Sequence, residues 1–139
     1  MPTMLEAEDA MFQAFKDAWE DRTPVDWPNV ARSGPHLRDG KASWAAVDIS
    51  HDGSDQHSFG QEGERTFTRT GGITVRVFVP AGERGLTPAS DLATVAANAF
   101  EGKTHGGVRF YRVGVKTVGR DGSWYQVNAH ADFEFDEVK

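Results

Sequence analysis

Histidine and aspartate residues gather in one polar segment and are the first candidates for chemistry. His51 and His57 lie among Asp48, Asp52 and Asp55, side chains of the types that bind divalent metal ions. Their spacing does not match a catalytic zinc pattern such as His-Glu-x-x-His. The segment is also polar and glycine-rich, so the sequence favours a solvated loop over a metal centre.

A second group with metal-ligand side chains is formed by His130, Asp132 and Glu134, which alternate along a predicted strand. Alternate residues of a strand share a face, so these three side chains would lie in a row. The row offers a site for a divalent ion, but the polar face of an ordinary sheet has the same pattern and is favoured. A small metal-dependent enzyme that uses His130, Asp132 and the histidines of the first segment is the alternative from another functional class.

Other catalytic motifs are absent from the sequence. The chain has no cysteine, which excludes a thiol nucleophile, disulfides and thiolate metal sites, and no serine lies in a Gly-x-Ser-x-Gly elbow. Glu101-Gly-Lys-Thr104 is similar to the end of a phosphate-binding loop, but Lys103 follows a predicted helix rather than a strand and a glycine-rich loop. We therefore predict no catalytic residues, no bound metal, no cofactor and no enzymatic activity.

Arginines on the predicted strands are the other notable charged group. They contrast with a net charge of −6 and allow two interpretations, contacts between copies of an acidic protein or an ordinary solvated sheet face. The sequence leaves both open. The six arginines are Arg65, Arg69, Arg76, Arg109, Arg112 and Arg120.

Length and composition limit the possible classes of protein. The 139 residues suffice for a single domain, residues 1–139, with its own core. The negative net charge argues against a dedicated nucleic-acid surface. No apolar run is long enough to span a membrane, and the acidic N-terminus lacks the features of a signal peptide. We expect a protein that is made in a cytoplasm.

Two helices are predicted to position the rest. Thr3 and Glu6 form a capping box, and a helix should follow to about Glu20. The two prolines around Trp27 end it and leave that indole against the core. A second helix begins at Thr87-Pro88 and ends near Gly102. The apolar stripe of the first helix comprises Met4, Met11, Phe12, Phe15, Ala18 and Trp19.

Alternating apolar residues predict the strands. A long strand is expected to bend at Gly71-Gly72, and the last strands form a hairpin around Asp121-Gly122, followed by a frayed tail from Asp136. The predicted strands cover residues 43–50, 65–80, 108–118 and 123–135.

Between the first two strands, residues 51–64 are polar and glycine-rich, and their middle, residues 56–60, is predicted to extend the sheet as an arm, with residues 65–70 returning antiparallel. The fold class is therefore α+β: a four- or five-stranded, mostly antiparallel sheet with two helices packed on one face and an extended loop or β-arm.

An ordered set of segments resembles the bacteriophage tail-terminator and minor-tail-protein family related to the lambda tail terminator, in particular its small phage-related domain. The set spans nearly the whole chain, and residues 53–63 correspond least. The segments are Phe12-Gln-Ala-Phe-Lys-Asp-Ala-Trp19, Thr23-Pro-Val-Asp-Trp-Pro-Asn-Val30, Arg69-Thr-Gly71, Val75-Arg-Val-Phe-Val-Pro-Ala-Gly82, Ala99-Phe-Glu-Gly102 and Asp121-Gly-Ser-Trp-Tyr-Gln-Val-Asn128.

The resemblance implies a structural virion protein at the head-proximal end of a tail. Such proteins form a homohexameric ring that caps the tail tube, stops its polymerisation and presents a surface to the head-completion protein. The expected partners are other copies of the chain, the major tail tube protein and the head-completion protein. A head-completion or neck adaptor protein is the alternative within the virion. The arm residues expected at the oligomer or tube interface are Gln56, Phe59, Arg65 and Arg69.

Overall fold

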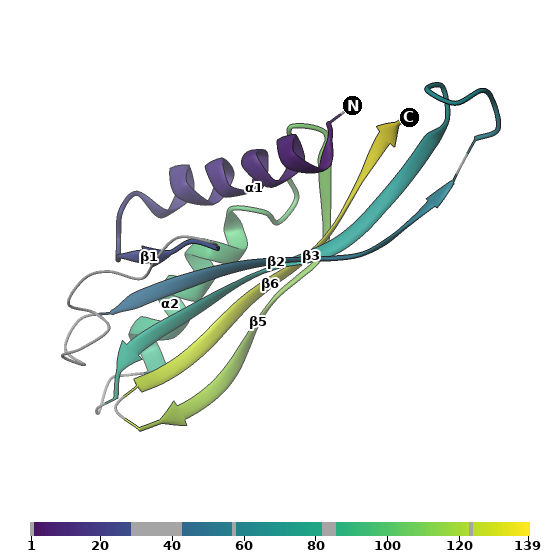
Figure 1. Cartoon of the computed structure of the whole chain (residues 1–139). Helices are drawn as coiled ribbons and strands as arrows, with labels where there is room; N and C mark the ends of the chain where they lie inside the picture. Colours follow the sequence, from purple (N-terminus) through teal and green to yellow (C-terminus); the bar gives the residue numbers. More distant parts are fainter. Residues whose placement is uncertain (1, 29–42, 57, 82–85, 123) are drawn as a thin grey trace.

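A single sheet with both helices on one face makes up the fold (Figure 1). The computed structural model describes residues 2–28, 43–56, 58–81, 86–122 and 124–139. The α+β architecture is as predicted, but the sheet has six strands rather than four or five. The elements are α1 (Met4–Trp19), β1 (Val25–Asp26), β2 (Trp44–Gln56), β3 (Thr66–Pro80), α2 (Leu86–Asn98), β4 (Thr104–His105), β5 (Val108–Asp121) and β6 (Trp124–Val138).

The two strands missing from the prediction, β1 and β4, have only two residues each. The strand order is β1-β2-β3-β6-β5-β4, and every neighbouring pair is antiparallel except β1 and β2. The β1 pairing begins where the amide of Ala45 donates to the carbonyl of Pro24, at 3.0 Å. Prolines on both sides of β1 keep it short, because proline lacks a donor for the ladder. The predicted loop at residues 29–41 lies outside the described residues.

Helix α1 begins at the predicted capping box. The hydroxyl of Thr3 accepts from the amide of Glu6 at 3.2 Å, and the Glu6 carboxylate accepts from the amide of Thr3 at 3.3 Å. The buried face repeats every four residues along the helix, as an amphipathic helix requires. Met4, predicted on this stripe, is partly exposed because the buried part starts one turn later. The buried side chains are Ala7, Met11, Phe15 and Trp19.

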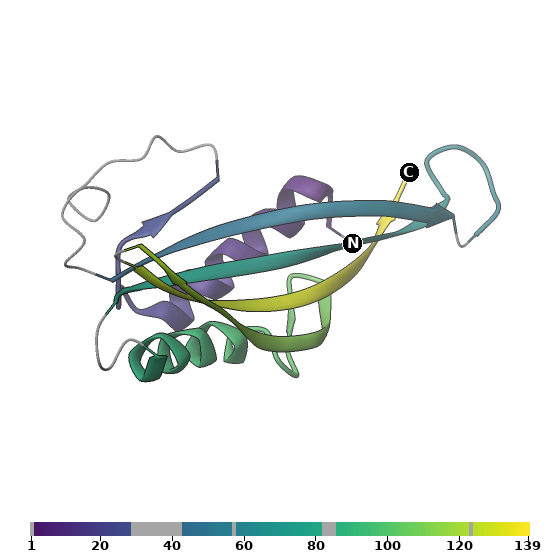
Figure 2. The same cartoon turned by 90° about the horizontal axis from the view of Figure 1, so that it is seen from below.

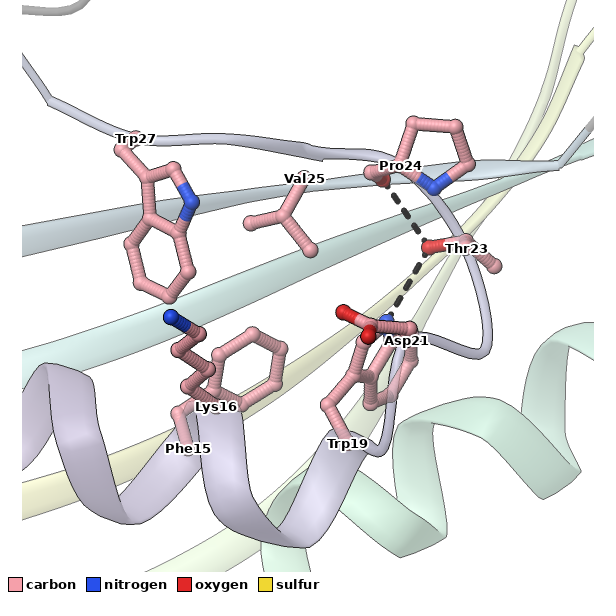
Figure 3. Close-up of a pocket in the computed structure, with 8 residues that line it drawn as sticks. All are labelled: Phe15, Lys16, Trp19, Asp21, Thr23, Pro24, Val25 and Trp27. Atoms are coloured by element: carbon pink, nitrogen blue, oxygen red, sulfur yellow. Dashed lines mark hydrogen bonds between the residues drawn. The ribbon is translucent and has the colours of Figure 1, made fainter.

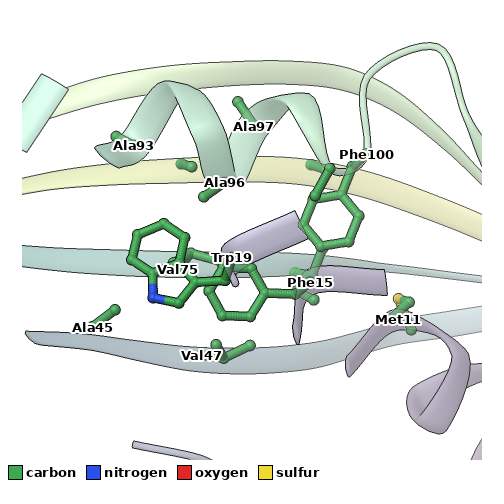
Figure 4. Close-up of a cluster of buried hydrophobic side chains, with 14 of the residues drawn as sticks. Met11, Phe15, Trp19, Ala45, Val47, Val75, Ala93, Ala96, Ala97 and Phe100 are labelled. Carbon is green, nitrogen blue, oxygen red and sulfur yellow. The ribbon is translucent and has the colours of Figure 1, made fainter. Parts of the chain in front are cut away.

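Helix α2 packs against β6 and β3 through small side chains, which let it lie close to the sheet (Figure 4). It joins α1 in one core with the inward-facing valines and alanines of β2, β3 and β6. The helix ends at Asn98, four residues before the predicted cap Gly102, which has a positive φ in the following turn. Its buried alanines are Ala89, Ala93, Ala96 and Ala97.

The predicted bend at the glycine pair of β3 coincides with an irregularity in the neighbouring strand. The register of β2 on β3 shifts between His51 and Gly53, opposite Gly71 and Thr70. A Cβ on Gly71 would collide with the carbonyl oxygen of Ser50 and would lie 2.6 Å from Cζ of Phe133. Glycine is therefore required here by close approach of the neighbouring strands.

The predicted frayed tail is wrong. Residues 136–138 belong to β6 and pair with the first three residues of β3, and the amide of Lys139 donates to the carbonyl of Arg65 at 2.9 Å. The position at the end of the chain suggested fraying, but the pairing with β3 gives the backbone groups of these residues partners. The hairpin turn is also tighter than predicted, because β5 continues to Asp121.

Replacing Gly71 with alanine tests the close approach. The G71A variant should lose about 1–3 kcal/mol of unfolding free energy, because the methyl group meets backbone that has no room to move. Urea denaturation measures this loss. The matched control is G53A, where nothing lies within 4 Å of the added carbon, and it should change stability by less than about 1 kcal/mol. Equal effects in the two variants would contradict the packing argument.

Candidate functional site

An arm that projects beyond the helices is the most distinctive surface of the molecule (Figures 1 and 2). It is made of the second half of β2, the first half of β3 and the end of β6. Every residue of β2 from Ser50 to Gln56 is exposed. The arm is thus a three-stranded extension of the sheet whose β2 strand is exposed, while Phe133 and Phe135 of β6 remain buried at its base.

Side chains on β3 and β6 hold the arm together. Nε of Arg69 donates to Oε2 of Glu137 at 2.8 Å, and this pair is largely shielded, with side chains 17% and 16% exposed. The hydroxyl of Thr68 donates to Oδ1 of Asp136 at 2.6 Å. Ion pairs that are partly shielded from water are screened less than surface pairs. These two contacts therefore link the arm halves of β3 and β6.

Three of the four predicted interface residues gather at the tip of this arm. Gln56 ends β2 and donates to the carbonyl of Ser58 at 2.8 Å, and Arg65 donates to the carbonyl of Gly60 at 3.0 Å. Phe59 lies between them in the sequence and is 99% exposed. Arg69 lies deeper in the arm, where Glu137 occupies its guanidinium. Whether any of them forms an interface stays a prediction.

The candidate metal ligands are held by other side chains. His130 contacts the hydroxyl of Thr74 through Nδ1 and Oδ1 of Asp132 through Nε2, both at 2.9 Å. His51 contacts Oε1 of Glu8 at 2.8 Å. No group of three or more metal-binding side chains occurs within the described part of the chain. His57 falls outside that part.

The arginines on the strands mostly pair within the chain. Arg76 lies 2.7 Å from Asp48, and Arg109 bridges Glu134 at 3.2 Å and Asp136 at 3.5 Å. Desolvation acts to lower the pKa of Arg109, but its hydrogen bonds to the two carboxylates and their charges outweigh this and raise the pKa. Pairing inside the sheet therefore explains several arginines that the sequence left open to contacts between copies.

Two basic side chains of β5 have no ion pair within the described chain. Lys116 has no ion-pair partner among the residues that the structure describes, and Arg120 donates only to the carbonyl of Gly122, at 3.3 Å. Arg112 is intermediate, since it lies 3.8 Å from Asp132 and its side chain is 80% exposed. Free positive charge therefore collects along β5.

A pocket between α1 and β1 has aromatic walls (Figure 3). The indole of Trp19 donates to the hydroxyl of Thr23 at 3.2 Å, and that hydroxyl donates to the carbonyl of Pro24 at 3.0 Å. The volume is about 150 Å³, below the ~300–1,000 Å³ of most small-molecule sites. The sequence predicted Trp27 against the core but not this pocket, because β1 was not recognised. Its lining residues are Phe15, Lys16, Trp19, Asp21, Thr23, Pro24, Val25 and Trp27.

Two open grooves lie along α1, with volumes of about 450 and 410 Å³. The first contains Asp17, Lys103 and His105, and the second contains Asp9 and Lys16. His105 is committed to the carbonyl of Ala99 at 2.9 Å. Neither groove brings together a nucleophile and a base. None of the helices in the described residues is long and apolar enough to cross a membrane.

Comparison with known proteins identifies the fold but no family. No family model and no curated protein matches the sequence. One solved structure, of a protein without a functional description, has a TM-score of 0.64 at 18% identity and covers 97% of this chain and 96% of its own. The fold therefore recurs over the full length of another protein.

A weaker likeness is to a chain in a structure described as the virion of a native gene transfer agent particle. The TM-score is 0.49 at 15% identity, over 96% of this chain and 95% of that one. At this similarity the comparison supports no functional conclusion for this chain.

Removing residues 136–139 tests the role of β6 in the arm. The truncated chain loses the partners of Thr66, Phe67 and Thr68, so amides in the arm half of β3 should exchange hydrogen at least about tenfold faster. Amides of residues 73–79 should keep their exchange rates. The control is E137Q, which keeps the ladder and should have a smaller effect. Unchanged exchange in the truncated arm would show that β6 does not support it.

Proposed function

We propose that this chain is a structural protein of a phage-like virion, a tail terminator whose ring caps the tail tube. In this proposal the ring stops tube growth and then presents a surface to the head-completion protein. The arm carries the proposal: an extension of the sheet with an exposed aromatic residue at its tip is suited to binding a neighbouring subunit or the tube.

The resemblance noted in the sequence supports the same role. Its segments fall on α1, β1, β3, the turn after α2 and the β5–β6 hairpin. The resemblance is therefore spread over most of the fold. Residues 53–63 at the tip of the arm, where correspondence is poorest, are the part expected to adapt to one partner.

Phe59 is the strongest candidate for a contact residue. A lone exposed aromatic residue is common on protein surfaces, but this one stands at the end of the arm. Aromatic side chains are frequent among the residues that dominate binding energy, because they bury a large area at little entropic cost. A second subunit or the tube would cover this ring.

The polar groups of the sheet favour a structural role over catalysis. The row of His130, Asp132 and Glu134 is occupied by Thr74 and by neighbouring arginines rather than free for a metal or substrate. These contacts stabilise strand pairing, and they leave no evident nucleophile and base facing a shared cavity in the described ranges.

The direct test is a capping assay with the tail tube protein of the same particle. Tube polymerisation should stop when this chain is added, and electron microscopy should find it at tube ends. Binding to the portal-side protein, with no effect on tubes, would instead favour a neck adaptor. Failure to bind either protein would overturn the virion role.

Deleting residues 56–60 tests the arm. Gln56, Phe59 and Gly60 are exposed and Ser58 is half-buried, and none of them belongs to the core, so the variant should keep its melting temperature and circular dichroism but should fail to form rings. F59A should weaken ring formation while leaving residues 56–60 in place. The matched control is L5A, which removes another exposed apolar side chain, 67% exposed on α1. A deletion variant that still assembles rings would contradict the proposal that the arm is needed for ring formation.

A further inference from the structure

The two long strands at the margins of the sheet have unpaired edges. On one side β1 pairs with only Ala45 and Ala46, and on the other β4 pairs with only Val108 and Arg109. Beyond these residues no strand of the described chain covers β2 or β5. Figure 2 shows β2 and β5 at opposite margins of the sheet. Unpaired backbone donors and acceptors make such edges templates for another strand.

The two edges carry opposite charge. Residues 47–56 of β2, the acidic edge, contain Asp48, Asp52 and Asp55 and no lysine or arginine. Residues 110–121 of β5, the basic edge, contain Arg112, Lys116 and Arg120 and one acid, Asp121. The contrast is sharp in a chain whose net charge is −6.

Much of this charge is available to a partner. Asp52 and Asp55 are exposed and have no ion pair within the described ranges, whereas Asp48 is held by Arg76. On the basic edge, Lys116 and Arg120 likewise have no carboxylate partner in the described chain. The unsatisfied charges of the two signs therefore lie on opposite margins of one sheet.

We infer that the acidic edge of β2 in one copy pairs with the basic edge of β5 in the next copy, so that the sheet continues from subunit to subunit. This inference rests on the proposed function for the premise that the chain associates with itself, and it names the surface. The strands β2, β3, β6 and β5 alternate in direction. A following copy in the same orientation therefore places its β2 antiparallel to β5.

The charges of the two edges also favour a head-to-tail assembly over a two-fold dimer. Two basic edges repel each other, as do two acidic edges, because like charges on facing strands are destabilising. A two-fold dimer through either edge is therefore disfavoured. The remaining contact is head to tail, and contacts of this kind close into rings when the rotation permits.

Two irregularities in β5 limit which strands can pair with its free edge. Its register against β6 shifts between Tyr111 and Gly114 and again between Thr117 and Gly119, and Arg112 has a φ of 50°. Bulges and basic side chains discourage indiscriminate strand pairing. A partner strand with acidic side chains offsets the charge, so the edge accepts one kind of neighbour.

The test is charge reversal at each edge, followed by sedimentation velocity at low salt. K116E/R120E makes the β5 edge acidic, and D52K/D55K makes the β2 edge basic. Each variant alone should associate at least about tenfold more weakly than the wild-type chain. A mixture of the two should recover association, because every contact in an alternating ring then joins opposite charges. The chain with all four substitutions should also recover it.

Control variants carry the same changes away from the edges: K103E/R22E and D91K/E101K, at exposed positions. These should associate as the wild-type chain does, and melting curves check that every variant folds. Three outcomes would overturn edge pairing. They are rings that form despite both charge reversals, a mixture of the two variants that does not associate, and a wild-type chain that stays monomeric at low salt. The tube-capping assay judges the proposed function separately, so a wild-type chain that caps tubes would keep that proposal even if edge pairing fails.

Discussion

The continuous ladder between β3 and β6 is the constraint on which the rest of the structure depends. It runs without a register shift from the pair Thr66 and Val138 to the pair Pro80 and Trp124. A slip of one residue would turn every buried side chain of these strands to the opposite face. One half of the ladder carries the two helices and the core, and the other half carries the arm. The same two paired strands, β3 and β6, therefore run through both the body and the arm.

Charged residues on this sheet divide into two groups with different consequences. Those on β3 and β6, such as Arg69 and Glu137, pair with each other and strengthen the ladder. On the outer strands, Asp48 and Arg109 pair inward with the central strands, whereas Asp52, Asp55, Lys116 and Arg120 have no ion pair in the described chain. An acidic protein that concentrates its spare positive charge on one margin is suited to ordered self-association. The proposed ring follows from this distribution together with the projecting arm.

Much of the fold could be predicted from local patterns. The capping box of Thr3 and Glu6 and the alternation along β6 depend on residues close in sequence, and both were predicted correctly. The pairing of the tail with β3 could not be predicted, because its partners lie about 70 positions away in sequence and chain ends are commonly frayed. The arginine pairs and the two charged margins required the strand order, which no local pattern contains.

Sedimentation velocity of the wild-type chain over a wide concentration range, alone and with tail tubes, tests the central claim most directly. The account predicts a discrete species of about six chains of 15.3 kDa whose sedimentation coefficient stops rising with concentration, since a closed ring has no free ends. Co-sedimentation with tubes should then saturate at tube ends. A chain that remains monomeric at every concentration and does not sediment with tubes would contradict the account.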